Sequence, residues 1–186
     1  MSNHAMQLFR LIATGSALLL MACGTQAATG KHRGATSAPM LSMERTTCFG
    51  MCPAYRVTLT GGGHITFDGI AHVQTMGPAS AQASPAQLKA VRAAIDQADL
   101  RSLGDHYTTH EDGCSPLMMD MNGVKITISD THGSKTVNFY YGCRGAIANR
   151  VRPRIDKLAD TIDQQLDTAR WIGKPGGPGI PGEVTH

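Results

Sequence analysis

Cysteine placement is the feature of this sequence that most constrains its fold. Five cysteines occur in 186 residues, and one of them, Cys23, ends an apolar N-terminal run. The other four are Cys48, Cys52, Cys114 and Cys143. An even number of cysteines in an exported chain predicts disulfides, and four cysteines allow three connectivities. Because aromatic residues make up only 5% of the chain, we expect a modest core that disulfide bonds staple together.

Residues 1–22 have the layout of a signal peptide. Arg10 precedes an apolar run over 11–21, which is far shorter than the ~20 residues that a membrane-spanning helix needs. The run ends in Leu20-Met21-Ala22-Cys23, which resembles the lipobox of bacterial lipoproteins. The resemblance implies that Cys23 is acylated, becomes the mature N-terminus and anchors the chain to a membrane. Ordinary cleavage after Ala27 is the competing prediction and would release a secreted protein.

Two segments that flank the domain lack any apolar periodicity. Residues 23–39 contain the lipidated cysteine and a tether rich in Gly, Ala, Ser and Thr, and residues 173–186 are predicted to be a disordered Gly/Pro tail. Gly24 and Thr25 are not acidic, which by analogy with lipoprotein sorting favours the outer membrane. We therefore expect a bacterial cell-envelope protein that is anchored there and faces the periplasm.

Residues 40–172 are predicted to form a single α+β domain. Alternating apolar residues indicate strands over 55–60 and 64–67 around a glycine turn, then a turn at Asp68-Gly69 and a third strand over 70–75. Ser84 and Gln87 form a capping box at the start of a helix. Strands follow over 124–128 and 137–141, and Pro153 opens the last helix. The order βββ-α-ββ-α predicts an antiparallel sheet with two helices packed on one face.

Sequence position favours one of the three disulfide connectivities. Cys48 and Cys52 are separated by a segment that contains Gly50, so a local bridge is feasible. Cys114 precedes the predicted C-terminal hairpin and Cys143 follows it. The two ends of a hairpin are neighbours in space, which favours a Cys114–Cys143 bridge.

A family resemblance begins at the first cysteine pair. The segment Cys48-Phe-Gly-Met-Cys52-Pro-Ala-Tyr55 leads into an alternating strand, and later come Asp120, Tyr141-Gly-Cys143 and Arg170-Trp-Ile-Gly173. Together these segments resemble the bacterial family called domain of unknown function 6438. The resemblance covers most of the chain between residues 40 and 173, and it implies no particular activity.

A second resemblance predicts a different use for the same cysteines. Cys48-x-x-x-Cys52-Pro is similar to the copper-binding motif of periplasmic cytochrome oxidase assembly proteins. Thiolate ligands favour Cu(I), and a histidine such as His106 or His110 would be the third ligand of the copper ion. In those proteins a helix follows the motif, whereas here a strand is predicted after Pro53. A copper or thiol-redox role is therefore the alternative to structural disulfides.

The charge pattern excludes some partners and suggests others. A net charge of +3 is too small to predict a nucleic-acid binder. A basic cluster could contact anionic groups of lipids or envelope polymers, and it consists of Arg144, Arg150, Arg152 and Arg154. No residue pattern indicates catalysis, and we expect no cofactor. The sequence thus predicts a lipid-anchored, non-catalytic binding or structural module with an envelope polymer or protein as its partner.

Overall fold

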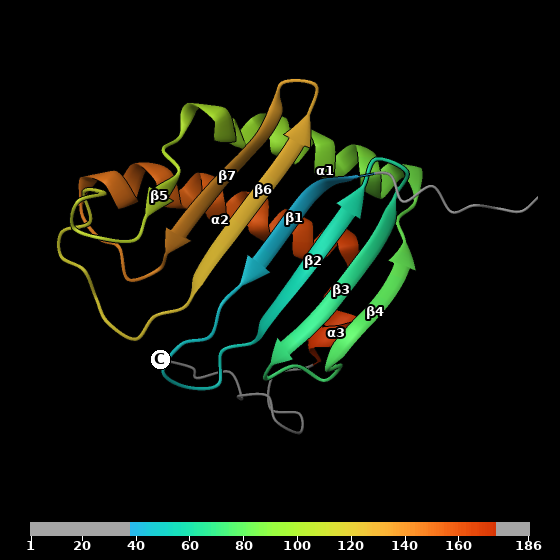
Figure 1. The fold of residues 1–186 in the computed structure, drawn as a ribbon, viewed down its shortest axis with the longest axis horizontal. Helices are drawn as coiled ribbons and strands as arrows, with labels where there is room; N and C mark the ends of the chain where they lie inside the picture. The colour runs from blue at the N-terminus through green and yellow to red at the C-terminus, as the bar shows by residue number, and fades with distance from the viewer. Residues whose placement is uncertain (1–37, 174–186) are drawn as a thin grey trace, which may run out of the picture. The chain divides into compact units, whose positions relative to one another are not determined.

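The computed structural model describes residues 38–173, which form one seven-stranded sheet and its helices (Figure 1). The sheet consists of β1 (Pro39–Arg45), β2 (Ala54–Thr60), β3 (His64–Ala71), β4 (Gly77–Gln82), β5 (His106–Tyr107), β6 (Gly123–Asp130) and β7 (Gly133–Tyr140). The helices are α1 (Pro85–Ala98), the 3₁₀ turn η1 (Leu100–Ser102), α2 (Ala146–Leu166) and α3 (Ala169–Ile172). The predicted α+β class is confirmed.

The strand order β4-β3-β2-β1-β6-β7-β5 places β1, the first strand within residues 38–173, at the centre of the sheet. β1 pairs antiparallel with β2 on one side and with β6 on the other, so that Ser42 lies opposite both Thr58 and Thr127. Only the short β5, which pairs with β7, runs parallel to its neighbour. The sheet is therefore antiparallel except at one edge.

Both long helices lie on one face of the sheet, as predicted (Figure 1). The hydrophobic core fills the space between the sheet and these helices. Alternate strand residues point to that face and are fully buried, among them Met43, Val57 and Ile126. α2 contributes the buried stripe that includes Ile155 and Ile162. No helix within residues 38–173 is long and apolar enough to cross a membrane.

The predicted turn at Asp68-Gly69 is wrong, because β3 continues through it to Ala71. Gly69 is needed for another reason: a Cβ there would lie 1.9 Å from the Thr75 carbonyl oxygen. Glycine therefore permits the segment after β3 to fold back against the backbone of β3. The predicted strand over 70–75 is also wrong, since those residues end β3 and form the connection to β4.

The predicted start of the last helix at Pro153 is wrong as well. α2 begins seven residues earlier, at Ala146, and Pro153 lies inside the helix with an exposed side chain. A proline costs a helix one backbone hydrogen bond, and α2 tolerates that loss because most of its stability comes from the apolar stripe packed on the sheet. The predicted helix over α1 is confirmed, including the Ser84–Gln87 capping box.

Candidate functional site

The four cysteines of the domain form two disulfides, Cys48–Cys52 and Cys114–Cys143. Both bridges lie at the end of the sheet where β1 finishes. The Cys114–Cys143 bridge is fully buried, whereas the Cys48–Cys52 bridge closes a short loop whose Phe49 side chain is 87% exposed. One bridge is therefore part of the core, and the other shapes a surface loop.

The buried bridge fixes the loop over residues 108–122 to the end of β7. Ser115 N donates to the Arg144 carbonyl oxygen (3.1 Å), and Met118 N donates to the Gly142 carbonyl oxygen (2.8 Å). A Cβ on Gly142 would lie 2.1 Å from the Met118 carbonyl oxygen, so only glycine allows this close pairing. The loop also contacts the Cys48–Cys52 loop, because Phe49 N donates to the Asp120 carbonyl oxygen (3.2 Å).

Two guanidiniums of the predicted basic cluster hold the chain between β7 and α2. Arg152 Nη2 donates to the carbonyl oxygens of Tyr141 (2.8 Å) and Cys143 (3.2 Å). Arg144 Nη1 donates to the same two oxygens. Arg152 also lies 5.6 Å from the ring centroids of both Phe139 and Tyr141, which adds cation–π attraction. These two arginines therefore satisfy backbone acceptors that no strand or helix partner reaches.

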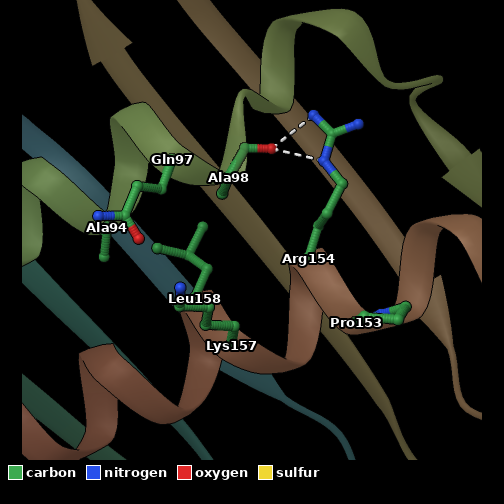
Figure 2. Close-up of a pocket in the computed structure, with 7 residues that line it drawn as sticks. All are labelled: Ala94, Gln97, Ala98, Pro153, Arg154, Lys157 and Leu158. Carbon is green, nitrogen blue, oxygen red and sulfur yellow. Dashed lines mark hydrogen bonds between the residues drawn. The ribbon is translucent and has the colours of Figure 1, made fainter.

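Arg154 ties α2 to the end of α1 (Figure 2). Its Nε and Nη2 donate to the Ala98 carbonyl oxygen (2.9 and 2.6 Å), and Nη2 also donates to the Asp99 carbonyl oxygen (2.6 Å). A cation at a helix C-terminus is favourable because the last carbonyl groups lack partners in the helix. Arg154 also lines a cavity of about 260 Å³ between α1 and α2. Arg150, the fourth member of the cluster, is exposed on α2.

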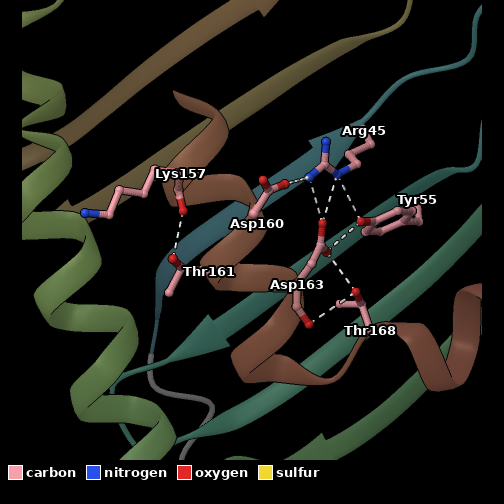
Figure 3. Close-up of polar contacts among 7 residues, drawn as sticks. All are labelled: Arg45, Tyr55, Lys157, Asp160, Thr161, Asp163 and Thr168. Carbon is pink, nitrogen blue, oxygen red and sulfur yellow. Dashed lines mark hydrogen bonds and ion pairs between the residues drawn. The ribbon is translucent and has the colours of Figure 1, made fainter. Parts of the chain in front are cut away.

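A polar network that sequence reasoning missed joins β1, β2 and α2 (Figure 3). Arg45 donates to one Asp163 carboxylate oxygen through Nε (3.0 Å) and Nη2 (2.8 Å). Tyr55 Oη and Thr168 Oγ1 donate to the other oxygen (2.6 and 2.8 Å). The side chains of Arg45 and Asp163 are only 17% and 21% exposed. The sequence showed Asp163 as one of several acidic residues along α2, with nothing to single it out.

The environment of this network explains its proton affinities. Burial, together with the adjacent Asp163 carboxylate, raises the pKa of Tyr55 well above its usual value. Burial alone would lower the pKa of Arg45, but the attraction of Asp163 outweighs it and the pKa is raised. Burial likewise raises the pKa of Tyr141 to about 12. The raised pKa values keep Tyr55 neutral and Arg45 charged at physiological pH, so both groups serve as hydrogen-bond donors that link β1 and β2 to α2.

The face of the sheet opposite the helices, called here the open face, carries a regular line of hydroxyl groups (Figure 1 looks onto it). Successive strands from β4 to β7 place one hydroxyl residue each directly opposite the next. We call this line the hydroxyl row, and it consists of Ser80, Thr66, Thr58, Ser42, Thr127 and Thr136. Thr127 and Thr136 hydrogen-bond each other (2.8 Å). Within residues 38–173 the other four hydroxyls have no hydrogen-bond partner.

A second line of side chains, the charged row, runs beside the hydroxyl row on the open face. It consists of Asp68, Arg56, Glu44, Lys125 and Asn138. The charges alternate in sign from strand to strand, and the four charged members sum to zero. Arg56 Nη2 contacts the Glu44 carboxylate at 2.6 Å, so neighbouring charges neutralise each other across the strands.

The charged row ends at a recess where the loop over 108–122 meets the open face. The recess has a volume of about 350 Å³ and is lined by Thr46, Thr108, Leu117, Met119, Gly123, Asn138 and Tyr140. Tyr140 Oη accepts from Met121 N (3.0 Å), which fixes the ring but leaves its own proton free to donate. A volume of about 350 Å³ is near the small end of the range for ligand pockets in proteins.

Comparison with known proteins decides the family of the chain. The family model "Domain of unknown function (DUF6438)" matches residues 39–166. The chain belongs to this family. No curated protein matches it. The match begins at β1 and ends with α2, so the family domain contains the whole sheet, both disulfides and both long helices.

Several residues singled out from the sequence can now be placed in the DUF6438 domain. Cys23 lies outside the described residues. Cys48 and Cys52 are joined in a disulfide, so neither is a thiolate in this structure. His110 Nδ1 lies 2.7 Å from the Cys114 carbonyl oxygen, and His106 is exposed in β5 at the opposite edge of the sheet from β4. Within residues 38–173 no three His, Cys, Asp or Glu side chains are grouped as metal ligands would be.

Sequence reasoning missed the two rows on the open face of the DUF6438 domain. Alternation within β2 already places Arg56 and Thr58 on one face. The rows, however, depend on the register between residues as far apart in the chain as Ser42 and Thr127, which are 85 positions apart. A pattern of polar residues alternating with buried ones was therefore available, but the order of the strands was not.

Proposed function

We propose that this DUF6438 protein is a lipid-anchored cell-envelope protein whose domain binds or supports a partner without catalysing a reaction. Acylated Cys23 would anchor the protein in a membrane. The expected membrane is the outer membrane, with the domain facing the periplasm. Two acyl chains or more make such an anchor stable. The partner would be an envelope polymer or protein, and the open face offers the broadest polar surface for it.

The observation that carries this proposal is the pairing of all four domain cysteines. Disulfides form and persist in oxidising compartments such as the periplasm and are rare in the cytosol. The charged residues near the bridges support a structural role in the same way: Arg144 and Arg152 bond to backbone carbonyls, and Asp163 bonds to Arg45. Each of these groups therefore makes contacts that stabilise the fold.

Metabolic labelling with palmitate tests the anchor. We expect the wild-type chain to incorporate label and to fractionate with membranes, and the Cys23→Ala variant to lose both properties. A Cys48→Ala variant is the matched control, because it removes a cysteine without touching the proposed acylation site. An unlabelled wild-type chain would refute the lipid anchor.

A thiol-redox or copper role is the second candidate, and the exposure of one bridge favours it. Cys48 and Cys52 are half-buried, and Phe49 and Met51 between them are 87% and 45% exposed, so an external dithiol could reach this bridge from the surface of the loop. That dithiol would be oxidised as the bridge is reduced to two thiols, whose thiolates are soft ligands for Cu(I). Counting free thiols in denatured protein taken directly from cells separates the candidates. No free thiols supports the structural role, and two free thiols at Cys48 and Cys52 support the alternative.

A further inference from the structure

We propose that the open face of the sheet binds an extended, uncharged polysaccharide chain that lies across the strands, along the hydroxyl row. This inference rests on the proposed role as a binding module and names the chemical class of its partner. Three features of the open face support it: the spacing of the hydroxyls, the balance of charges, and the recess at one end.

The hydroxyl row repeats at the distance between strands. Neighbouring strands lie about 4.8 Å apart, which is close to the length of one sugar unit in an extended polysaccharide. A Ser or Thr hydroxyl can both donate and accept a hydrogen bond, as a sugar hydroxyl can. Ser80, Thr66, Thr58 and Ser42 occupy four adjacent strands and have no hydrogen-bond partner within residues 38–173. These four side chains therefore offer a line of hydroxyl groups whose spacing is close to that of the sugar units in an extended polysaccharide.

The charged row selects for a neutral partner. Its four charges alternate and sum to zero, so the open face presents no field that would attract a polyanion or a polycation over distance. Carboxylate and amide groups are planar and can each bond two neighbouring hydroxyls, and the ammonium group of a lysine carries three donors for the same purpose. Asp68, Lys125 and Asn138 would therefore contact the edge of a sugar chain whose other edge lies on the hydroxyl row.

The recess offers a site where the polysaccharide could end or bend. It adjoins Asn138, the last member of the charged row, and Tyr140 contributes an aromatic ring to its lining. Aromatic rings pack well against the apolar faces of sugar rings, and the fixed Tyr140 hydroxyl can donate to a sugar oxygen. One sugar unit fits a volume of about 350 Å³.

Co-sedimentation with insoluble polysaccharides tests the proposal. The purified full chain is mixed with chitin, with amorphous cellulose, or with an insoluble β-1,3-glucan, three polysaccharides without charged groups in their repeating units, and the bound fraction is measured over a concentration series. We expect binding to at least one of the three, and the arm that binds identifies the type of sugar. Because an uncharged partner is involved, raising NaCl from about 0.05 to about 0.5 M should change the affinity less than twofold.

A double variant, Thr58→Val with Thr66→Val, removes two hydroxyls but keeps the β-branched shape that suits a strand. Neither hydroxyl has a partner within residues 38–173, so the melting temperature should not change. We expect binding about tenfold weaker, because two hydrogen bonds to the ligand are lost. Thr161→Val on α2, behind the sheet, is the matched control and should bind as wild type does.

Three results would overturn the proposal: no binding to any of the three polysaccharides, equal binding by the double variant and wild type, or binding that falls steeply with salt. The palmitate and thiol experiments are independent of these results. If they succeed while no polysaccharide binds, the proposed function stands and only the identity of the partner fails. If polysaccharide binds but Cys23 carries no lipid, the identity of the partner stands and the lipid anchor of the proposed function fails.

Discussion

Replacing Asp163 by asparagine isolates the contribution of one negative charge to the stability of the domain. Asparagine has nearly the same shape and can still accept from Tyr55 and Thr168, so the main change is that Arg45 loses its counter-charge. Both members of the pair are about four-fifths buried. Removing one partner of a buried ion pair costs about 3–5 kcal/mol, a large part of a total stability of about 5–15 kcal/mol.

Urea unfolding followed by circular dichroism measures this cost. With a typical slope of about 2 kcal/mol per molar urea, the midpoint for Asp163→Asn should fall by about 1.5–2.5 M. Asp160→Asn is the control, because Asp160 also faces Arg45 (3.4 Å) but its side chain is 78% exposed. Its effect should stay below about 1 kcal/mol, as for other exposed pairs.

A combined Arg45→Met, Tyr55→Phe and Asp163→Leu variant completes the test, because it removes the ion pair together with the buried Tyr55 hydroxyl that bonds to both of its members. Replacing a buried ion pair by apolar residues of similar size is often neutral, so this variant should recover most of the stability that Asp163→Asn loses. If Asp163→Asn unfolds within about 1 kcal/mol of wild type, or no differently from Asp160→Asn, the Arg45–Asp163 pair does not stabilise the domain as argued.

Three further predictions concern the bridges, the loop and high pH. Replacing Cys114 and Cys143 together by alanine should cost about 3.6 kcal/mol in urea unfolding, against about 2 kcal/mol for the bridge that closes the shorter loop; equal costs would contradict the chain-entropy argument. Gly142→Ala should lower the melting temperature by about 4–10 °C, since an overpacked site costs about 1–3 kcal/mol and backbone is in the way. Gly61→Ala, with open space around its Cβ, should leave the melting temperature within about 2 °C. Because the folded pKa of Tyr55 is raised, its contribution to stability is complete below pH about 10 and declines above it by about 1.4 kcal/mol per pH unit; a Tyr55→Phe variant that loses stability equally steeply would refute this.

Elements with strong local signals were predictable from the sequence. The α1 start is one example, because Ser84 Oγ accepts from Gln87 N (3.3 Å) and Gln87 Oε1 accepts from Ser84 N (2.8 Å) within four residues of chain. The bridge between Cys114 and Cys143 is another, since a hairpin brings its own ends together. Such features depend only on neighbours in sequence or on one hairpin.

Elements whose conformation depends on distant partners were not predictable. β4 contains no β-branched or aromatic residue and is a strand only because it pairs with β3. β1 begins at Pro39 and contains two methionines, a weak strand signal. Both strands were missed for this reason. The sequence likewise could not show that Arg154 reaches the carbonyl group of Ala98, 56 residues away.

The central position of β1 decides how the domain would respond to mechanical force. A chain anchored at Cys23 would transmit any pull to Pro39, the first residue of β1. β1 is bonded along both sides, to β2 and to β6, so tension along it must shear two ladders of hydrogen bonds simultaneously. An outer strand such as β4 could instead be peeled away one bond at a time. If the chain is anchored at Cys23 as proposed, this connection through the middle strand would let the domain keep its fold under tension between the anchor and a bound partner.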